Sequence, residues 1–173
     1  MQLIFKRTIA LLLLLTIVTA GAHAQKLFFL FAHGQYASPL DANFKNNYSY
    51  GVGVEGGVGI GTGKTFFMGT TGYTFFNDRA GHEAGNLTYV PLKLGVRHYL
   101  LVAKILYVQA DAGVATIHNK STGSNTSRFS GDIGAGVKLG PLEVGMSYDG
   151  FSHSDPSGYA SWLSFKAGWR LGL

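Results

Sequence analysis

The sequence lacks cysteine entirely, and this absence excludes two classes of exported protein. A lipoprotein needs a cysteine at its cleavage site, and a small disulfide-stapled secreted domain needs several cysteines. Charged residues are scarce as well, since Asp, Glu, Lys and Arg make up 13% of the chain, whereas a soluble domain carries about 25%. No run of like charges forms a basic patch, so nucleic acid is not an expected partner.

Long apolar runs are also missing beyond residue 25, and the one such run of the chain lies near its start. Lys6 and Arg7 precede thirteen largely apolar residues, 8–20, and an Ala-His-Ala pattern follows at residues 22–24. This arrangement is typical of a signal peptide, and the run is shorter than the roughly 20 residues that a membrane-spanning helix needs. We therefore expect a cleaved signal peptide at residues 1–24 and one domain at residues 25–173. An uncleaved N-terminal anchor is the alternative.

Glycine and aromatic residues, by contrast, are abundant, with 25 Gly, 12 Phe and 9 Tyr. The clearest pattern lies in residues 160–173, where every second residue is apolar and the residues between are small or charged. The apolar positions are Leu163, Phe165, Ala167, Trp169, Leu171 and Leu173. An alternation with a period of two predicts a β-strand with one apolar face.

The same alternation recurs in residues 48–61, 88–100, 105–117, 129–140 and 142–151. Residues 26–36 and 65–76 are extended and rich in aromatics, but the pattern does not decide which of their faces is apolar. The connections alternate in length: residues 61–64, 101–104 and 140–141 are short, whereas 37–47, 77–87, 118–127 and 152–159 are longer and polar. The sequence therefore predicts an all-β fold, an eight-stranded antiparallel up-and-down transmembrane β-barrel. Short periplasmic turns, longer extracellular loops and no helix of consequence are expected.

Alternation alone fits a soluble sandwich or a lipocalin-like barrel equally well, but further features favour a membrane barrel. The polar faces carry mostly glycine with scattered charges, which suits a narrow lumen better than a soluble surface. Aromatic residues gather near the expected strand ends, where their rings would lie at the headgroup level of a membrane. These residues are Tyr36, Tyr48, Phe75, Phe76, Tyr89, Tyr99, Tyr107, Phe151, Tyr159 and Trp162.

The C-terminal residues favour the outer membrane in particular. Lys166, Gly168, Leu171 and Leu173 match the polar-x-Gly-x-x-apolar-x-apolar signal for the barrel-insertion machinery, although Leu replaces the usual terminal Phe or Trp. We therefore expect export to the outer membrane and contact with the insertion machinery during biogenesis.

Three segments resemble a known family. They are Tyr89-Val-Pro-Leu-Lys-Leu-Gly-Val-Arg-His-Tyr99, Tyr107-Val-Gln-Ala-Asp-Ala-Gly-Val114 and Gly131-Asp-Ile-Gly-Ala-Gly-Val137. They are similar to the outer-membrane protein β-barrel domain common in Bacteroidetes, which resembles the small eight-stranded barrels of the OmpX and OmpA type. The resemblance implies the fold and gives no activity.

The polar faces of the expected strands carry ten charges that would point into the lumen. They are Glu55, Lys93, Arg97, Asp111, Asp132, Lys138, Glu143, Asp149, Lys166 and Arg170. An eight-stranded barrel is just wide enough for its side chains to fill, and an isolated buried ion is strongly disfavoured. We therefore expect the five acids and five bases to pair as a plug. The alternative is a narrow polar pore in which glycine leaves room for water.

The sequence gives little support for catalysis or metal binding. Residues 152–155, Ser-His-Ser-Asp, have the residue types of a Ser–His–acid site, but adjacent loop residues rarely reach the required geometry. The His-x-Ser pair of lipid A deacylase barrels, with its Glu about a dozen residues on, fails here because residue 155 is Asp and residue 165 is Phe. His82, His118 and His153 lack the spacing of metal ligands. We expect no enzymatic activity, no cofactor and no metal.

Three functions remain open from the sequence. The first is a monomeric structural or surface-interaction barrel that contacts outer-membrane lipid or lipopolysaccharide. The second is a narrow pore for ions or very small solutes, and the third is a soluble periplasmic barrel that binds a lipid. Arg79, Lys120 and Arg128 can touch lipopolysaccharide phosphates, but they fit ordinary solvated charges equally well, so the sequence assigns no binding site.

Cell fractionation separates the third function from the other two. We expect the protein in the outer-membrane fraction, with a gel mobility that differs between unheated and boiled samples, because a closed barrel resists detergent until it is heated. Recovery from the soluble periplasm without a heat-dependent shift would contradict the membrane barrel.

Overall fold

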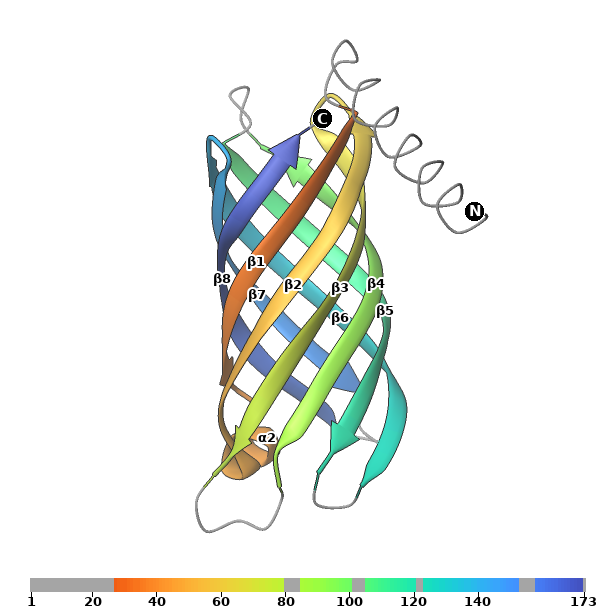
Figure 1. Cartoon of the computed structure of the whole chain (residues 1–173), viewed down its shortest axis with the longest axis vertical. Coiled ribbons are helices and arrows are strands. Elements are labelled where there is room, and N and C mark those ends of the chain that lie inside the picture. The colour runs from red at the N-terminus through yellow and green to blue at the C-terminus, as the bar shows by residue number, and fades with distance from the viewer. Residues whose placement is uncertain (1–26, 80–84, 101–104, 121–122, 153–157, 173) are drawn as a thin grey trace, which may run out of the picture.

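Eight antiparallel strands form a closed barrel in which each strand pairs with its neighbours in the chain and β1 pairs with β8 (Figure 1). The computed structural model describes residues 27–79, 85–100, 105–120, 123–152 and 158–172. The elements are β1 (Phe28–Pro39), α2 (Ala42–Asn47), β2 (Tyr48–Thr62), β3 (Thr65–Asp78), β4 (Leu87–Tyr99), β5 (Leu106–Asn119), β6 (Ser124–Leu139), β7 (Leu142–Ser152) and β8 (Tyr159–Gly172). The predicted eight-stranded up-and-down barrel is confirmed, and its closure leaves no sheet edge.

The two ends of the barrel differ in their connections. At the turn end, two residues join β2 to β3 and two join β6 to β7. The first residue of each turn is a glycine, Gly63 or Gly140, and both have a φ of 66°. A tight hairpin needs a positive φ at this position, which glycine adopts without steric cost. The opposite end, where α2 lies in Figure 1, is called the loop end.

The loop end departs from the sequence prediction in two places. Residues 37–47 were expected to form an irregular loop, but they contain the short helix α2, whose Asp41 side chain accepts a hydrogen bond from the Phe44 amide at 3.0 Å. Residues 118–127 were also expected to be a long loop. Instead, β5 and β6 stay paired out to Asn119 and Ser124, because polar side chains can line strands that project beyond the apolar band. Among the described residues, no helix has the length and apolar character needed to cross a membrane.

The alternation of faces agrees with the pattern in the sequence. The apolar positions point outward, as for Leu94 on β4, whose side chain is 74% exposed, while its neighbours Lys93 and Arg97 are buried inside. The faces of β1 and β3, which the sequence left open, are now assigned: Phe29 and His33 of β1 and Phe66 of β3 point inward. Both strands carry apolar residues on both faces, so hydrophobicity alone could not orient them.

The aromatic residues near the strand ends contradict the expected headgroup girdle. Seven of the ten are buried inside the barrel, with exposures between 0% and 6%. These seven are Tyr48, Phe76, Tyr89, Tyr99, Tyr107, Phe151 and Trp162. Tyr36 and Tyr159 are exposed on the outer surface, as expected of a girdle.

Glycine explains how so many rings fit into so narrow a barrel. Four inward rings each lie on a glycine that is their direct partner on the next strand. The pairs are Phe29 with Gly59, Phe31 with Gly57, Phe76 with Gly51 and Tyr107 with Gly136. A Cβ atom at Gly59 would lie 2.3 Å from the Phe29 ring. These glycines therefore make room for aromatic rings at four positions where the alternative of a polar pore would have them leave room for water.

Replacing one of these glycines should destabilise the barrel. We expect Gly59→Ala to lower the free energy of unfolding by about 1–3 kcal/mol, because overpacking forces the neighbouring ring out of its position. Denaturant unfolding in detergent micelles measures this change.

Gly69→Ala is the matched control. Gly69 faces outward, and a Cβ atom there would meet Val58 and Leu94 at 3.6 and 3.9 Å, which is ordinary contact. Equal stability of the Gly59 and Gly69 variants would mean that the Phe29 ring moves aside freely.

Candidate functional site in the barrel interior

The side chains inside the barrel form three layers along its axis. A turn-end aromatic cluster consists of Phe29, Phe31, Phe66, Met68, Tyr99 and Tyr107. A loop-end aromatic cluster consists of Ala37, Phe44, Tyr48, Phe76, Leu87, Tyr89, Ala115, Ile117, Phe151, Ala160 and Trp162. The buried charged and polar residues between them are called the polar layer, and they include most of the ten charges expected from the sequence.

The loop-end aromatic cluster closes around Phe44, the one buried residue of α2. Its ring lies 4.8 Å from Tyr48, 5.0 Å from Phe76, 5.7 Å from Trp162 and 6.0 Å from Phe151, measured between ring centroids. Such tilted and edge-on contacts are the favoured geometry for aromatic pairs. The helix thereby fills the mouth of the barrel with an apolar side chain.

Arg97 is the most heavily contacted charge of the interior. Its Nη1 donates to both Glu143 carboxylate oxygens, at 2.9 and 3.1 Å, and its Nε donates to Gln109 Oε1 at 2.7 Å. Its guanidinium carbon lies 4.2 Å from the centroid of the Tyr107 ring. Arg97 and Glu143 are each 1% exposed, so the pair has replaced its hydration with hydrogen bonds and cation–π contact.

Two lysines form ion pairs with two of three aspartates that lie in a row. Asp111, Asp132 and Asp149 are direct neighbours across β5, β6 and β7, and like charges in such positions repel one another. Lys93 Nζ forms ion pairs with Asp132 and, at 3.7 Å, with Asp149. Lys166 Nζ lies 3.8 Å from Asp149 and 2.8 Å from Glu55.

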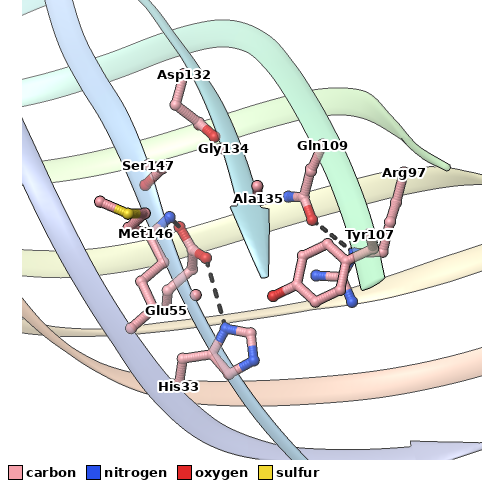
Figure 2. A pocket seen from close by; sticks show the side chains of 12 residues that line it. His33, Glu55, Arg97, Tyr107, Gln109, Asp132, Gly134, Ala135, Met146 and Ser147 are labelled. Carbon is pink, nitrogen blue, oxygen red and sulfur yellow. Dashed lines mark hydrogen bonds and ion pairs between the residues drawn. The ribbon is translucent and has the colours of Figure 1, made fainter. Parts of the chain in front are cut away.

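His33 belongs to the polar layer but was missed in the sequence. Its Nε2 lies 3.2 Å from Glu143 and its Nδ1 lies 3.9 Å from Glu55, which Figure 2 shows pointing toward the imidazole. The neighbouring inward residue Gln35 donates to the Thr74 hydroxyl. A usable signal was present, because His33 and Gln35 share one face of β1 and the opposite face carries Leu30, Ala32 and Gly34.

The remaining predicted charges lie at the margins of this network. Asp111 accepts from the Gln109 amide. Arg170 lies near the turn end, with its guanidinium carbon 3.9 Å from the centroid of Phe29 and its Nε 3.8 Å from Glu143. Lys138 is half-buried and is the cross-strand partner of Glu143.

The predicted insertion signal lies on both faces of β8. Lys166 and Gly168 point inward, where a Cβ atom at Gly168 would lie 1.9 Å from the Ala32 carbonyl oxygen. Leu171 is exposed on the outer face, and Leu173 lies outside the described residues.

The polar layer contains a small cavity. A cavity of about 20 Å³ is lined by polar groups that include His33, Glu55, Gln109, Asp132 and Lys166. Figure 2 shows the side chains of His33, Glu55, Gln109 and Asp132, which come from different strands. A cavity needs roughly 10–15 Å³ to hold one water molecule, so this space suits a single buried water more than a column of water.

The catalytic and metal candidates lie mostly outside the described residues. His153, Ser154, Asp155 and His82 all do. His118 is described, and its Nδ1 lies 2.8 Å from Asn125 Oδ1. Within the described part of the chain, no three His, Asp or Glu side chains gather in a way that would hold a metal ion.

Comparison with solved structures shows the same fold. The chain is similar to neisserial surface protein A, with a TM-score of 0.61, 13% identity, and coverage of 84% of this chain and 97% of that one. It is also similar to the Yersinia pestis outer membrane protein Ail in a phospholipid nanodisc, with a TM-score of 0.55, 13% identity, and coverage of 83% and 99%. No family model and no curated protein matches the sequence. At this identity the likeness shows a shared barrel fold.

Truncating the central arginine should cost much of the stability of the barrel. We expect Arg97→Ala to lower the free energy of unfolding by about 3–5 kcal/mol, because Glu143 is left buried without its principal partner. Tryptophan fluorescence during denaturant unfolding in micelles measures the loss.

Lys64→Ala, in an exposed turn, is the control and should change stability by less than about 0.5 kcal/mol. An Arg97 variant as stable as this control would show that the interior network contributes little.

Proposed function

We propose that this chain is an outer-membrane barrel with a structural and surface-interaction role, and that its lumen is plugged. One observation carries the proposal: the distribution of side chains is the reverse of that in a soluble protein. Large apolar side chains such as Leu94 and Phe67 are 74% and 72% exposed, whereas Lys93, Arg97 and Glu143 are each 1% exposed. A soluble lipid-binding barrel would keep its apolar face inside, so this distribution argues against that alternative.

The proposed orientation follows the connections. In outer-membrane barrels the short turns face the periplasm and the longer loops face the exterior. The turn end, which holds the two-residue turns at Gly63 and Gly140, is therefore assigned to the periplasm, and α2 to the exterior.

A cleaved signal peptide at residues 1–24, insertion through the C-terminal signal, and a monomeric state complete this proposal. The three segments similar to the barrel domain of Bacteroidetes support an OmpX- or OmpA-like group.

The plug is favoured over the pore for two reasons. Ion pairs cross the polar layer between strands that are distant in sequence, as in Lys166–Glu55 and Arg97–Glu143. The aromatic clusters lie above and below this layer, and Phe44 occupies the mouth at the loop end. An ion crossing the lumen would have to displace both the rings and the paired charges. The proposed role therefore lies with the outer surface and the loop end, toward outer-membrane lipid and lipopolysaccharide.

Conductance in a planar bilayer tests the plug. Refolded residues 25–173 should insert and give no stable current steps, since an ion would have to displace the paired charges of the polar layer and the rings of the two aromatic clusters. Folding is checked independently by the heat-dependent gel shift, so that a protein that fails to fold is not mistaken for a plugged barrel.

The double variant Lys93→Ala with Arg97→Ala separates plug from pore. Under the plug it lowers the denaturant midpoint of unfolding, because the acids of the polar layer lose their partners. Reproducible steps in the native protein, with an ion selectivity that changes in the double variant, would establish the pore and end the plug proposal.

A further inference from the structure

The outer wall of the barrel changes character near the loop end of β3, β4 and β5. Val90 and Val114 face outward and are exposed. The next outward positions toward the loop end are Thr88 on β4, which pairs with His118, and Thr116 on β5, which pairs with Val90. In a membrane barrel, this step from aliphatic to hydroxyl side chains marks where lipid tails end and headgroups begin.

A lysine lies against the wall at this level. Lys120 directly follows β5, and its Nζ lies 5.4 Å from the centroid of the Phe75 ring on β3, so its side chain reaches past β4. Phe75 faces outward, since its neighbour Phe76 is fully buried inside. The backbone holds the lysine in place, because the Lys120 amide donates to the Asn86 carbonyl oxygen at 3.0 Å.

The groups beneath this lysine form a partly covered polar patch. Tyr73 is 49% exposed, and its hydroxyl lies 3.5 Å from the Thr88 hydroxyl. Thr88 occupies an outward position and yet is 8% exposed. The wall therefore presents one ammonium group and the hydroxyl group of one tyrosine above an aliphatic surface, and the buried Thr88 lies beside that tyrosine.

Lys120 differs in position from Arg79 and Arg128, the other two residues that the sequence suggested for contact with lipopolysaccharide phosphates. Arg128 is the cross-strand partner of Ala115, which is buried inside, so Arg128 occupies a lumen-facing register position. The Arg79 amide donates to Asn47 at the end of α2, which places residue 79 at the barrel mouth. Among the described residues, no carboxylate forms an ion pair with Lys120, whose ammonium group lies against the Phe75 ring.

We propose that Lys120, with Tyr73, binds a phosphate of lipid A, the membrane anchor of lipopolysaccharide, on the outer wall of β3–β5. The inference rests on the proposed outer-membrane location and names a site for the proposed lipid partner. The ammonium group pairs with the phosphate, and the exposed Tyr73, whose hydroxyl lies 3.5 Å from the Thr88 hydroxyl, meets the sugar. Acyl chains then run along Val90 and Val114. A cation beside apolar surface interacts more strongly with an anion than a fully solvated one does.

Binding of purified diphosphoryl lipid A tests the site. The refolded domain, residues 25–173, is studied in micelles of a neutral detergent, and native mass spectrometry reports the fraction with lipid A bound. Lys120→Gln should weaken binding about fivefold, because one lysine at a membrane surface contributes about 1 kcal/mol toward an anionic lipid. Lipid A stripped of its phosphates should bind the native protein and the variant equally weakly.

Lys45→Gln is the matched control, since Lys45 is exposed on α2 at the mouth of the barrel. This variant should bind diphosphoryl lipid A within twofold of the native protein. An equal loss in both variants would show attraction by overall charge and would overturn the site. Unchanged binding in the Lys120 variant would also overturn it.

The failure of this site and the failure of the proposed function are distinguishable. A protein that fractionates with the outer membrane and shows the heat-dependent gel shift, but does not distinguish lipid A with phosphates from lipid A without them, refutes the site alone. A protein that neither fractionates with the membrane nor inserts into bilayers refutes the proposed function and the site with it.

Discussion

The structure depends on one constraint: inside a narrow closed barrel, a buried charge needs protein partners in place of its hydration. Arg97, Glu143 and His33 join β4, β7 and β1 through direct contacts, and Lys166 joins β8 to β2 through Glu55. These contacts cross the lumen, whereas hydrogen bonds of the sheet link only adjacent strands. The polar layer therefore braces the barrel from within, and the aromatic clusters at both ends keep water from competing for its charges.

Much of the barrel could be predicted from the sequence, because the alternation of side chains is a direct consequence of strand geometry. Where one face was polar, as around Lys93 and Asp132, the inward side was identified correctly. Where both faces carried apolar residues, as in β1 and β3, periodicity could not tell the lipid-facing side of the strand from its lumen-facing side. The aromatic residues were misplaced for a related reason: Tyr89 and Trp162 suit a headgroup and a packed interior equally well. The ring–glycine pairs that decide between the two depend on strand register, which the sequence does not show.

For the candidate sites too, the sequence shows the residue types but not the contacts that they make. The charges of the polar layer were visible as residue types, but their pairing was not, since Lys166 and Glu55 are 111 positions apart. The role of Phe44 depends on a helix of six residues whose formation relies on the Asp41 cap. Lys120 was one of three equivalent cations in the sequence. Its position on the outer wall follows from the length to which β5 and β6 stay paired, a tertiary feature.

The separation of partners along the chain also bears on how the barrel assembles. His33 and Glu143 are 110 positions apart, and β1 pairs with β8 from Phe29–Gly172 to Pro39–Trp162. Contacts of such high sequence separation form late and slowly. A chain in which β8 has not yet paired with β1 cannot complete its interior, and its lumen charges stay hydrated until the last strand arrives. Closure and drying of the interior are thus one event, and it occurs only when both ends of the domain are present together.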